Sequence, residues 1–132
     1  LRLLAATSGR VGRVALSPPE RAPMIRPVNY VFDDQSQSVL FRSAPGSTLH
    51  AAVASATAAF EIDGSDPVAR TGWSVIVVGP VEEVSDPAEV GRIEELELEP
   101  WAPGLRGHWV RIRAVSASGR RIVRAFAPDE RV

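Results

Sequence analysis

Residues 70–85, RTGWSVIVVGPVEEVS, limit the possible folds more than any other segment, because they carry apolar side chains on both faces of one strand. Side chains alternate between the two faces of a strand. Trp73, Val75 and Val77 fall on one face, and Ile76 and Val78 fall on the other. In an antiparallel barrel only one face of a strand points to the interior. We therefore expect a second subunit to cover the other face, which predicts a homodimer, and we expect Gly79 and Pro80 to bend this long strand.

Five other segments have the β-branched, aromatic or alternating residues that are typical of strands. They are residues 11–17, 24–34, 38–43, 57–63 and 108–119. A short helix is predicted to begin near Gly46 or Ser47, and a second helix is predicted from the capping box that Asp86 and Glu89 form around Pro87. Six predicted strands with short helices between them indicate a mainly β fold. We expect a six-stranded antiparallel barrel with Greek-key-like connections, since closing the sheet removes exposed strand edges.

The domain organisation follows from the same pattern. The chain has 132 residues, near the usual size of one domain, and contains no internal repeat. We place a single domain at residues 1–122 and a charged C-terminal tail at 123–132, and we expect the chain to be loose from Arg120 onward.

Charge and composition exclude several classes of function. The net charge is -1, so no basic field is predicted for nucleic acid or for an anionic membrane, and no apolar run reaches the roughly 20 residues of a membrane span. There is no cysteine, which removes disulfides and thiolate chemistry, and we expect a cytoplasmic protein. His50 and His108 are the only histidines, so no metal site is predicted. With no GxSxG, Walker or GxGxxG motif, a bound cofactor would carry any chemistry.

One candidate anion site lies where a predicted strand passes into a helix. Arg42 and Ser43 end the strand, and Gly46, Ser47 and Thr48 begin the helix. Backbone N–H groups at a helix start, two hydroxyls and an arginine suit a phosphate group. Alternatively, Ser47 is only a helix cap and Arg42 only a solvated strand residue.

Pro27 marks a second candidate place within the predicted strand 24–34. Proline cannot donate to a strand ladder. This part of the strand must therefore be an edge, a bulge or a place where something other than a strand lies alongside it.

Five runs of sequence, in order, resemble one known family. They are RPVNYVFDD, VLFRSAPGSTL, AAFEIDGSDPVARTGWSVIVVGPVEEVSDPAEV, PWAPGLRGHWVRI and SGRRI. Together they resemble the pyridoxamine 5'-phosphate oxidase-like, FMN-binding split-barrel family, in the branch of small actinobacterial-type proteins that includes nitroimidazole-reductase relatives. The resemblance covers roughly residues 1–122.

This resemblance implies a homodimer that binds FMN in the groove between its subunits. The residues implied at the flavin ring are Arg26, Pro27, Val28 and Asn29. Those implied at the phosphate and ribityl end are Arg42, Ser43, Gly46, Ser47 and Thr48. Trp73 and Ser74 are implied around the dimer seam, with Trp101 and Trp109 as further candidates, and simple packing is the alternative role for each tryptophan.

The implied activity is that of an FMN-dependent oxidoreductase that passes a hydride to a small substrate, with no residue assigned as a catalytic acid or base. Relatives commonly carry lysine at the position of Thr48, and this chain contains no lysine. The missing ion pair with the phosphate leaves two alternatives open. One is a deazaflavin cofactor, and the other is a cofactor-free dimeric binding module on the same barrel.

Overall fold

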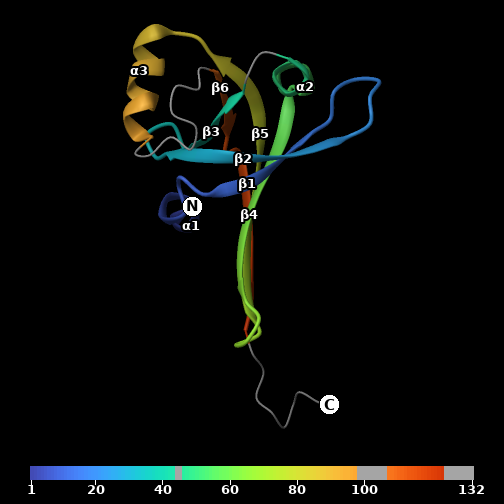
Figure 1. The fold of residues 1–132 in the computed structure, drawn as a ribbon, viewed down its shortest axis with the longest axis vertical. Helices are drawn as coiled ribbons and strands as arrows, with labels where there is room; N and C mark the ends of the chain where they lie inside the picture. Colours follow the sequence, from blue (N-terminus) through green and yellow to red (C-terminus); the bar gives the residue numbers. More distant parts are fainter. Residues whose placement is uncertain (44–45, 98–106, 124–132) are drawn as a thin grey trace.

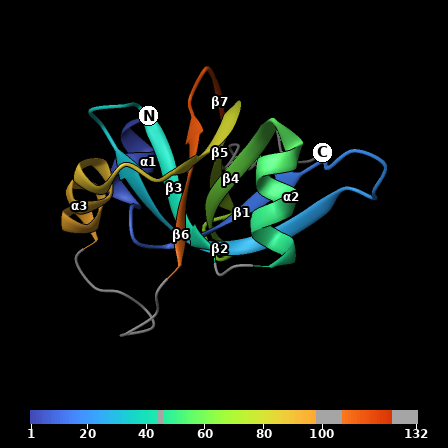
Figure 2. The ribbon, with the colours of Figure 1, turned by 90° about the horizontal axis from the view of Figure 1, so that it is seen from above.

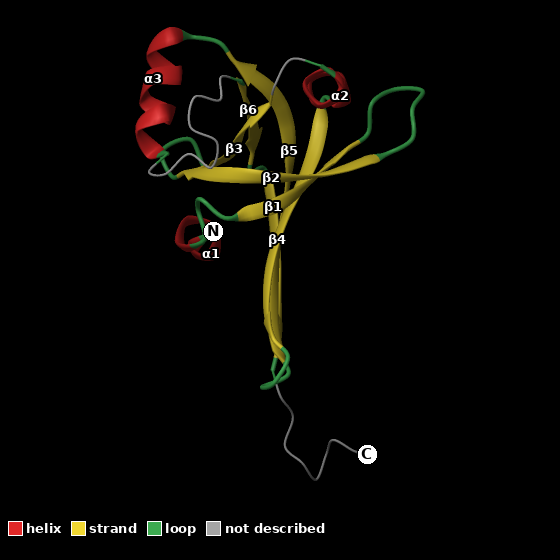
Figure 3. Ribbon diagram, viewed as in Figure 1, coloured by secondary structure: helices red, strands yellow, loops and turns green. Residues whose placement is uncertain are grey.

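The computed structural model describes residues 1–43, 46–97 and 107–123, which form a barrel of strands with three short helices (Figures 1 and 3). The helices are α1 (Arg2–Ala6), α2 (Ser47–Ser55) and α3 (Pro87–Leu96). The strands are β1 (Val11–Leu16), β2 (Met24–Asp33), β3 (Ser38–Ser43), β4 (Thr57–Asp66), β5 (Thr71–Val84), β6 (His108–Arg113) and β7 (Ser116–Ile122). In Figure 2, α2 and α3 lie on opposite sides of the barrel.

Six of these strands close the barrel. The order is β4, β1, β2, β3, β6 and β5, and β5 pairs with β4 to complete the circle, with every pair antiparallel. The prediction of a mainly β, six-stranded antiparallel barrel is therefore confirmed. A seventh strand, β7, pairs with residues 72–78 of β5, which also pair with β4.

The predicted last strand, 108–119, is wrong as a single element. The chain leaves β6 at Ala114, whose N–H donates to the Gln37 carbonyl at 2.9 Å, and resumes at Ser116 as β7. The break moves the chain from one half of β5 to the other, because β6 pairs with residues 81–84 and β7 with residues 72–78. β7 runs to Ile122, so the expectation of a loose chain from Arg120 fails for residues 120–122, whose backbone pairs with β5.

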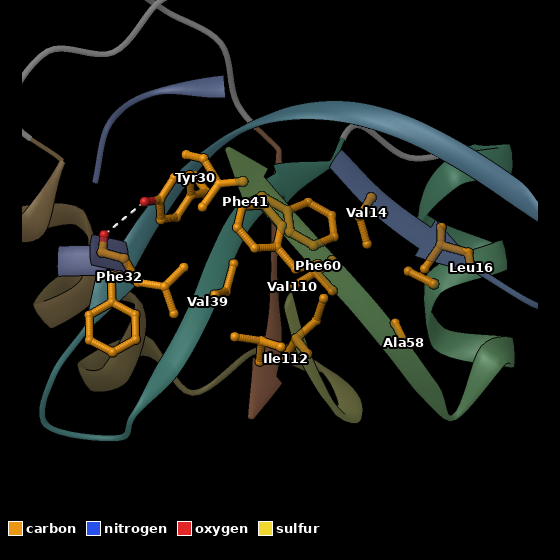
Figure 4. Close-up of a cluster of buried hydrophobic side chains, with 14 of the residues drawn as sticks. Val14, Leu16, Tyr30, Phe32, Val39, Phe41, Ala58, Phe60, Val110 and Ile112 are labelled. Carbon is orange, nitrogen blue, oxygen red and sulfur yellow. Dashed lines mark hydrogen bonds between the residues drawn. The ribbon is translucent and has the colours of Figure 1, made fainter. Parts of the chain in front are cut away.

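The inward faces of the strands form one apolar core (Figure 4). Phe60 of β4 pairs with Val77 of β5, and both are fully buried beside Phe41 of β3. Tyr30 is also buried here, and its hydroxyl donates to the Leu4 carbonyl of α1 at 2.7 Å. This hydrogen bond holds α1 against one side of the core.

β5 has the two apolar faces that the sequence predicts. Val75 and Val77 lie in the core, whereas Ile76 and Val78 remain 41% and 37% exposed on the outside of this chain. The strand passes from its β4 and β7 partners to its β6 partner between Val78 and Val81. At this crossing Gly79 lies against the last residue of β6, where a Cβ atom on Gly79 would be 1.6 Å from the Arg113 carbonyl oxygen.

α3 begins at the predicted cap and is held to the barrel by ion pairs. The Asp86 carboxylate accepts from the Glu89 N–H at 3.1 Å, with Pro87 in the first turn. Arg92 of α3 forms two hydrogen bonds to the buried Asp33 of β2, at 3.1 and 2.7 Å. Glu89 does not complete the capping box, because its carboxylate binds Arg92 at 2.6 Å and Arg111 of β6 at 2.5 Å.

Candidate functional site

The barrel is open along part of β2. Residues 24–29 of β2 pair with β1, and residues 30–33 pair with β3 on the other side. Within the described residues, no strand therefore pairs with the second edge of 24–29. Pro27 lies in this half-paired stretch, opposite Arg13. Of the three alternatives that Pro27 left open, the edge is confirmed for this part of β2.

The four residues predicted at the flavin ring line this edge on alternating sides. Register places Arg26 opposite the buried Val14, while Val28 packs against the core, so these two side chains lie on the inward side of β2. Pro27 is exposed on the outward side. Asn29 ties the edge to the α1–β1 turn, since its amide donates to the carbonyls of Gly9 and Arg10.

The predicted phosphate cradle begins at the end of β3 and continues at the start of α2. Ser43 is buried at the end of β3, and Gly46 is the N-cap of α2 with φ at 143°. This left-handed backbone favours glycine. A Cβ atom at Gly46 would meet no described atom within 4 Å. The side chains of Ser47 and Thr48 lie outside what the structure describes.

The Arg42 side chain contacts the carboxyl end of α3. Arg42 and Ser43 are successive strand residues, so their side chains point to opposite faces. The Arg42 guanidinium contacts Glu97 at 2.9 Å and Glu94 at 3.4 Å, and it stacks 4.7 Å from the centre of the Trp109 ring. The charge of Arg42 is thus directed toward α3, and its role as a phosphate ligand stays a prediction.

Two of the three tryptophans can be placed. Trp109 is buried in a second apolar cluster, beneath α3, with Leu40 and Ile93. Trp101 lies outside the described residues. Trp73 is half-buried near the far end of β5, where β4, β5 and β7 form a three-stranded arm that extends beyond the barrel (Figure 1).

The arm brings together residues that the sequence did not connect. Trp73 pairs with Gly64 on one side and Arg121 on the other, and Ser74 lies between Asp63 and Arg120 on the opposite face. Two open grooves of about 520 and 540 Å³ adjoin Trp73. Arg10, from the turn before β1, lines the first of them, and Arg121 lines both. Arg10 and Arg121 carried no predicted role, because β7 has no apolar alternation to reveal it as a strand.

Charged groups of the described residues gather elsewhere on the outer wall. Arg13 of β1 contacts Glu61 at 2.5 Å and Asp63 at 3.2 Å, and burial together with the nearby Asp63 raises the pKa of Glu61. The part of the chain that the structure covers holds no group of three His, Asp or Glu residues arranged for a metal ion. In the same residues, no helix has the length and apolarity to cross a bilayer.

A closed six-stranded antiparallel barrel whose second strand leaves half of one edge unpaired is a split barrel. The family model described as pyridoxamine 5'-phosphate oxidase matches residues 1–121 of this sequence. The chain therefore belongs to the pyridoxamine 5'-phosphate oxidase family, as its sequence runs indicated.

Individual relatives agree with this assignment. The uncharacterized protein Rv0080 of Mycobacterium tuberculosis is 39% identical over 129 residues, which cover 93% of this chain and 80% of that protein. The FAD binding protein from Mycobacterium smegmatis is 34% identical, with 92% of each chain covered and a TM-score of 0.74. An FAD-binding protein from Mesorhizobium loti is 25% identical, covering 89% of this chain and 90% of that chain, with a TM-score of 0.66.

Proposed function

We propose that this protein is a flavin-dependent oxidoreductase that acts as a homodimer and passes a hydride to a small organic substrate. The observation that carries the proposal is the unpaired edge of β2 at residues 24–29, in a chain whose helix α2 begins at the N-cap Gly46. Its similarity to two FAD-binding proteins, one of them 34% identical, supports a flavin in this role.

The described residues fit a flavin at this edge. Residues 26–29 are half-buried or exposed, and no strand of the described chain lies along their unpaired edge. A flat ring can lie along this edge. The α2 start offers backbone N–H groups to a phosphate, because the first N–H groups of a helix have no partner within it. A flavin in this place would supply the hydride chemistry, and the protein would bind it, orient it and exclude water.

FMN is the reference flavin of this proposal, because it has one ring system for the β2 edge and one phosphate for the α2 start. Purified chain freed of ligand should bind FMN with a change in flavin fluorescence. Its thermal midpoint should also rise, since a ligand at about 100 times its Kd stabilises the folded state by roughly 2.7 kcal/mol.

Two variants and a second ligand complete this experiment. Arg26→Gln should weaken FMN binding, whereas Arg21→Gln, which removes the same charge from the exposed β1–β2 loop, should leave it unchanged. Tighter binding of a deazaflavin than of FMN would replace the cofactor but keep the site. If neither compound changes fluorescence or thermal stability, the oxidoreductase proposal fails and the cofactor-free binding module takes its place.

The proposed dimer uses the outward face of the sheet formed by β2, β1, β4 and β5. Register aligns an apolar row across these four strands, from Ile25 through Ala15 and Ala59 to Val78. The next row runs from Pro27 through the Arg13–Glu61 ion pair to Ile76. An exposed apolar row across four strands is typical of a surface that binds a partner. A second copy fits it, because an antiparallel sheet face with a central ion pair can complement itself across a two-fold axis.

Replacing Ile76 by aspartate should convert the dimer to a monomer, because the new charge would be buried in the interface without a partner. Light scattering after size-exclusion chromatography measures the change. Val77→Asp is unsuited to this test, since Val77 is fully buried in the core of each chain. Val68→Asp is the matched control, because Val68 is 90% exposed in the β4–β5 turn. A stable Ile76→Asp dimer would place the interface on another surface.

A further inference from the structure

We infer that the arm of β4, β5 and β7 binds the adenosine diphosphate part of a dinucleotide against Trp73, beside the arginines Arg10 and Arg121. The inference rests on the proposed function in one respect, because a bound FAD would be one source of this group. Seven residue pairs of the β4–β5 ladder, about 23 Å, separate Trp73 from the end of α2, so an FAD whose flavin phosphate lies at the α2 start would present its adenosine diphosphate part to the arm of the second copy in the proposed dimer. The other source would be a nicotinamide dinucleotide that delivers the hydride. Both share an adenine ring joined through ribose to two phosphates.

The backbone of the arm holds the Trp73 side chain in a defined place. The indole lies over Gly64 of the paired strand, where a Cβ atom would be 2.7 Å from the indole nitrogen. A glycine at this position is therefore required for the ring to lie close to the sheet. Trp73 remains half-buried and borders both grooves, so it offers an aromatic surface at their common wall. Stacking of a base on such a surface is a common mode of nucleotide binding.

Among the residues that the structure describes, the arginines around this tryptophan lack ion pairs, unlike those beside α3. In the described residues, Arg10, Arg120 and Arg121 have no hydrogen bond or salt bridge to a carboxylate, and Arg121 pairs in register with Trp73. The arginines on the other side of the barrel are engaged by carboxylates, as Arg92 and Arg111 show. Arginine binds phosphate oxygens through its forked N–H groups.

The acidic residues that border the grooves are already engaged. The Asp66 carboxylate accepts from the N–H groups of Val68 and Ala69, at 3.0 and 3.1 Å, in the turn of the arm. Asp63 is directed toward Arg13 at 3.2 Å. Each groove is lined by two arginines and one aspartate, which gives it a formal charge of +1 in a protein whose net charge is -1. A small anionic ligand fits this local charge, whereas a long polyanion would find no extended basic surface.

The size and apolar edge of the grooves fit a nucleotide. Each groove lies within the roughly 300–1,000 Å³ that is typical of small-molecule sites. Ile122 lines both grooves and is exposed in this chain, so it can cover part of the base or ribose. The first groove presents two arginines and one aromatic ring. The adenosine diphosphate part of a dinucleotide has two phosphates for Arg10 and Arg121 and a base for Trp73. FMN has only one phosphate and one ring system.

The test uses the full chain freed of ligand and measures four affinities by calorimetry: ADP, FMN, FAD and NADH. ADP alone should bind, and FAD should bind at least about tenfold tighter than FMN. Arg121→Gln and Arg10→Gln should each reduce ADP and FAD affinity by about tenfold, the size of one charge-assisted hydrogen bond, and leave FMN affinity unchanged. Trp73→Phe should retain binding and Trp73→Leu should lose it, while Arg21→Gln serves as the charge-matched control.

The outcomes separate this inference from the proposed function. FAD affinity above that of FMN, and sensitive to Arg121, identifies FAD as the source. Equal FAD and FMN affinities, with NADH binding that depends on Arg121, identify the nicotinamide dinucleotide. If flavins fail to bind but ADP binds and depends on Arg121 and Trp73, the oxidoreductase proposal fails and the nucleotide site stands. Failure of ADP to bind, or ADP binding that none of the Arg121, Arg10 and Trp73 variants changes, would overturn the inference.

Discussion

Replacing Gly79 by alanine is expected to abolish stable folding of the barrel. The added methyl group would lie 1.6 Å from the Arg113 carbonyl oxygen and 2.8 Å from its carbon, far inside any van der Waals contact. Both atoms belong to the backbone at the end of β6, so no side-chain rotation can relieve the overlap. The strands would have to separate where β5 exchanges its partners, at a cost above about 4 kcal/mol, which few single substitutions reach.

Urea denaturation followed by circular dichroism measures this loss, and the soluble yield on expression gives a second readout. Gly91→Ala in α3 is the matched control, because a Cβ atom there meets no atom within 4 Å. Alanine in a helix is favoured over glycine by about 1 kcal/mol, so this variant should be as stable as the parent or more stable. A Gly79→Ala protein with the parent's midpoint would contradict the close approach of Gly79 to the Arg113 carbonyl.

The second large effect is expected from Arg92→Met, which removes the partner of a buried carboxylate. The Asp33 side chain is only 2% exposed and receives two hydrogen bonds from Arg92. Breaking a buried pair by removing one member typically costs about 3–5 kcal/mol, because the remaining charge is left without compensation. α3 should also loosen from β2, since Arg92 is the α3 residue that bonds to this strand through Asp33.

Denaturation midpoints of Arg92→Met and Arg113→Met provide the comparison. Arg113 and its partner Glu82 are 46% and 47% exposed, and exposed pairs contribute about 1 kcal/mol or less. The double variant Arg92→Met with Asp33→Asn should recover part of the lost stability, because no buried charge remains. Equal losses for Arg92→Met and Arg113→Met would contradict the assignment of a buried pair.

The same pair predicts a dependence on pH. Hydrogen bonds from Arg92 lower the pKa of Asp33 to about 2, from a usual 3.8. The folded pKa lies below the unfolded pKa, so the folded state favours the charged carboxylate. Its contribution, about 2 kcal/mol, is fully present above about pH 5 and is lost as the pH falls through 4 toward 2. Asp33→Asn should flatten this part of the stability profile.

Local patterns in the sequence were sufficient for most of the barrel. Asp86 and Pro87 predicted the start of α3, because a helix cap depends on residues within one turn. The two apolar faces of β5 were visible because strand alternation depends only on neighbouring residues. Pro27 marked the unpaired edge of β2, since a residue without an N–H group restricts its own strand wherever that strand lies.

Other features depend on pairing between distant segments. β7 was merged with β6 because its exposed polar residues give no periodic signal, and only its pairing with residues 72–78 of β5 defines it. The partner of Arg42 depends on α3, more than fifty positions later, so a residue that reads as a phosphate ligand lies beside Glu97. The juxtaposition of Arg10, Trp73 and Arg121 combines a turn, a hairpin strand and the last strand.

Short-range chemistry therefore accounts for the class of fold, for the edge at Pro27 and for the apolar outer face of β5. Tertiary structure alone decides which charges meet and where grooves form, because strand register and chain crossings set the distances between groups that are far apart in sequence. The crossing at Gly79 shows this dependence, since nothing around Gly79 in the sequence indicates that the Arg113 carbonyl lies against it.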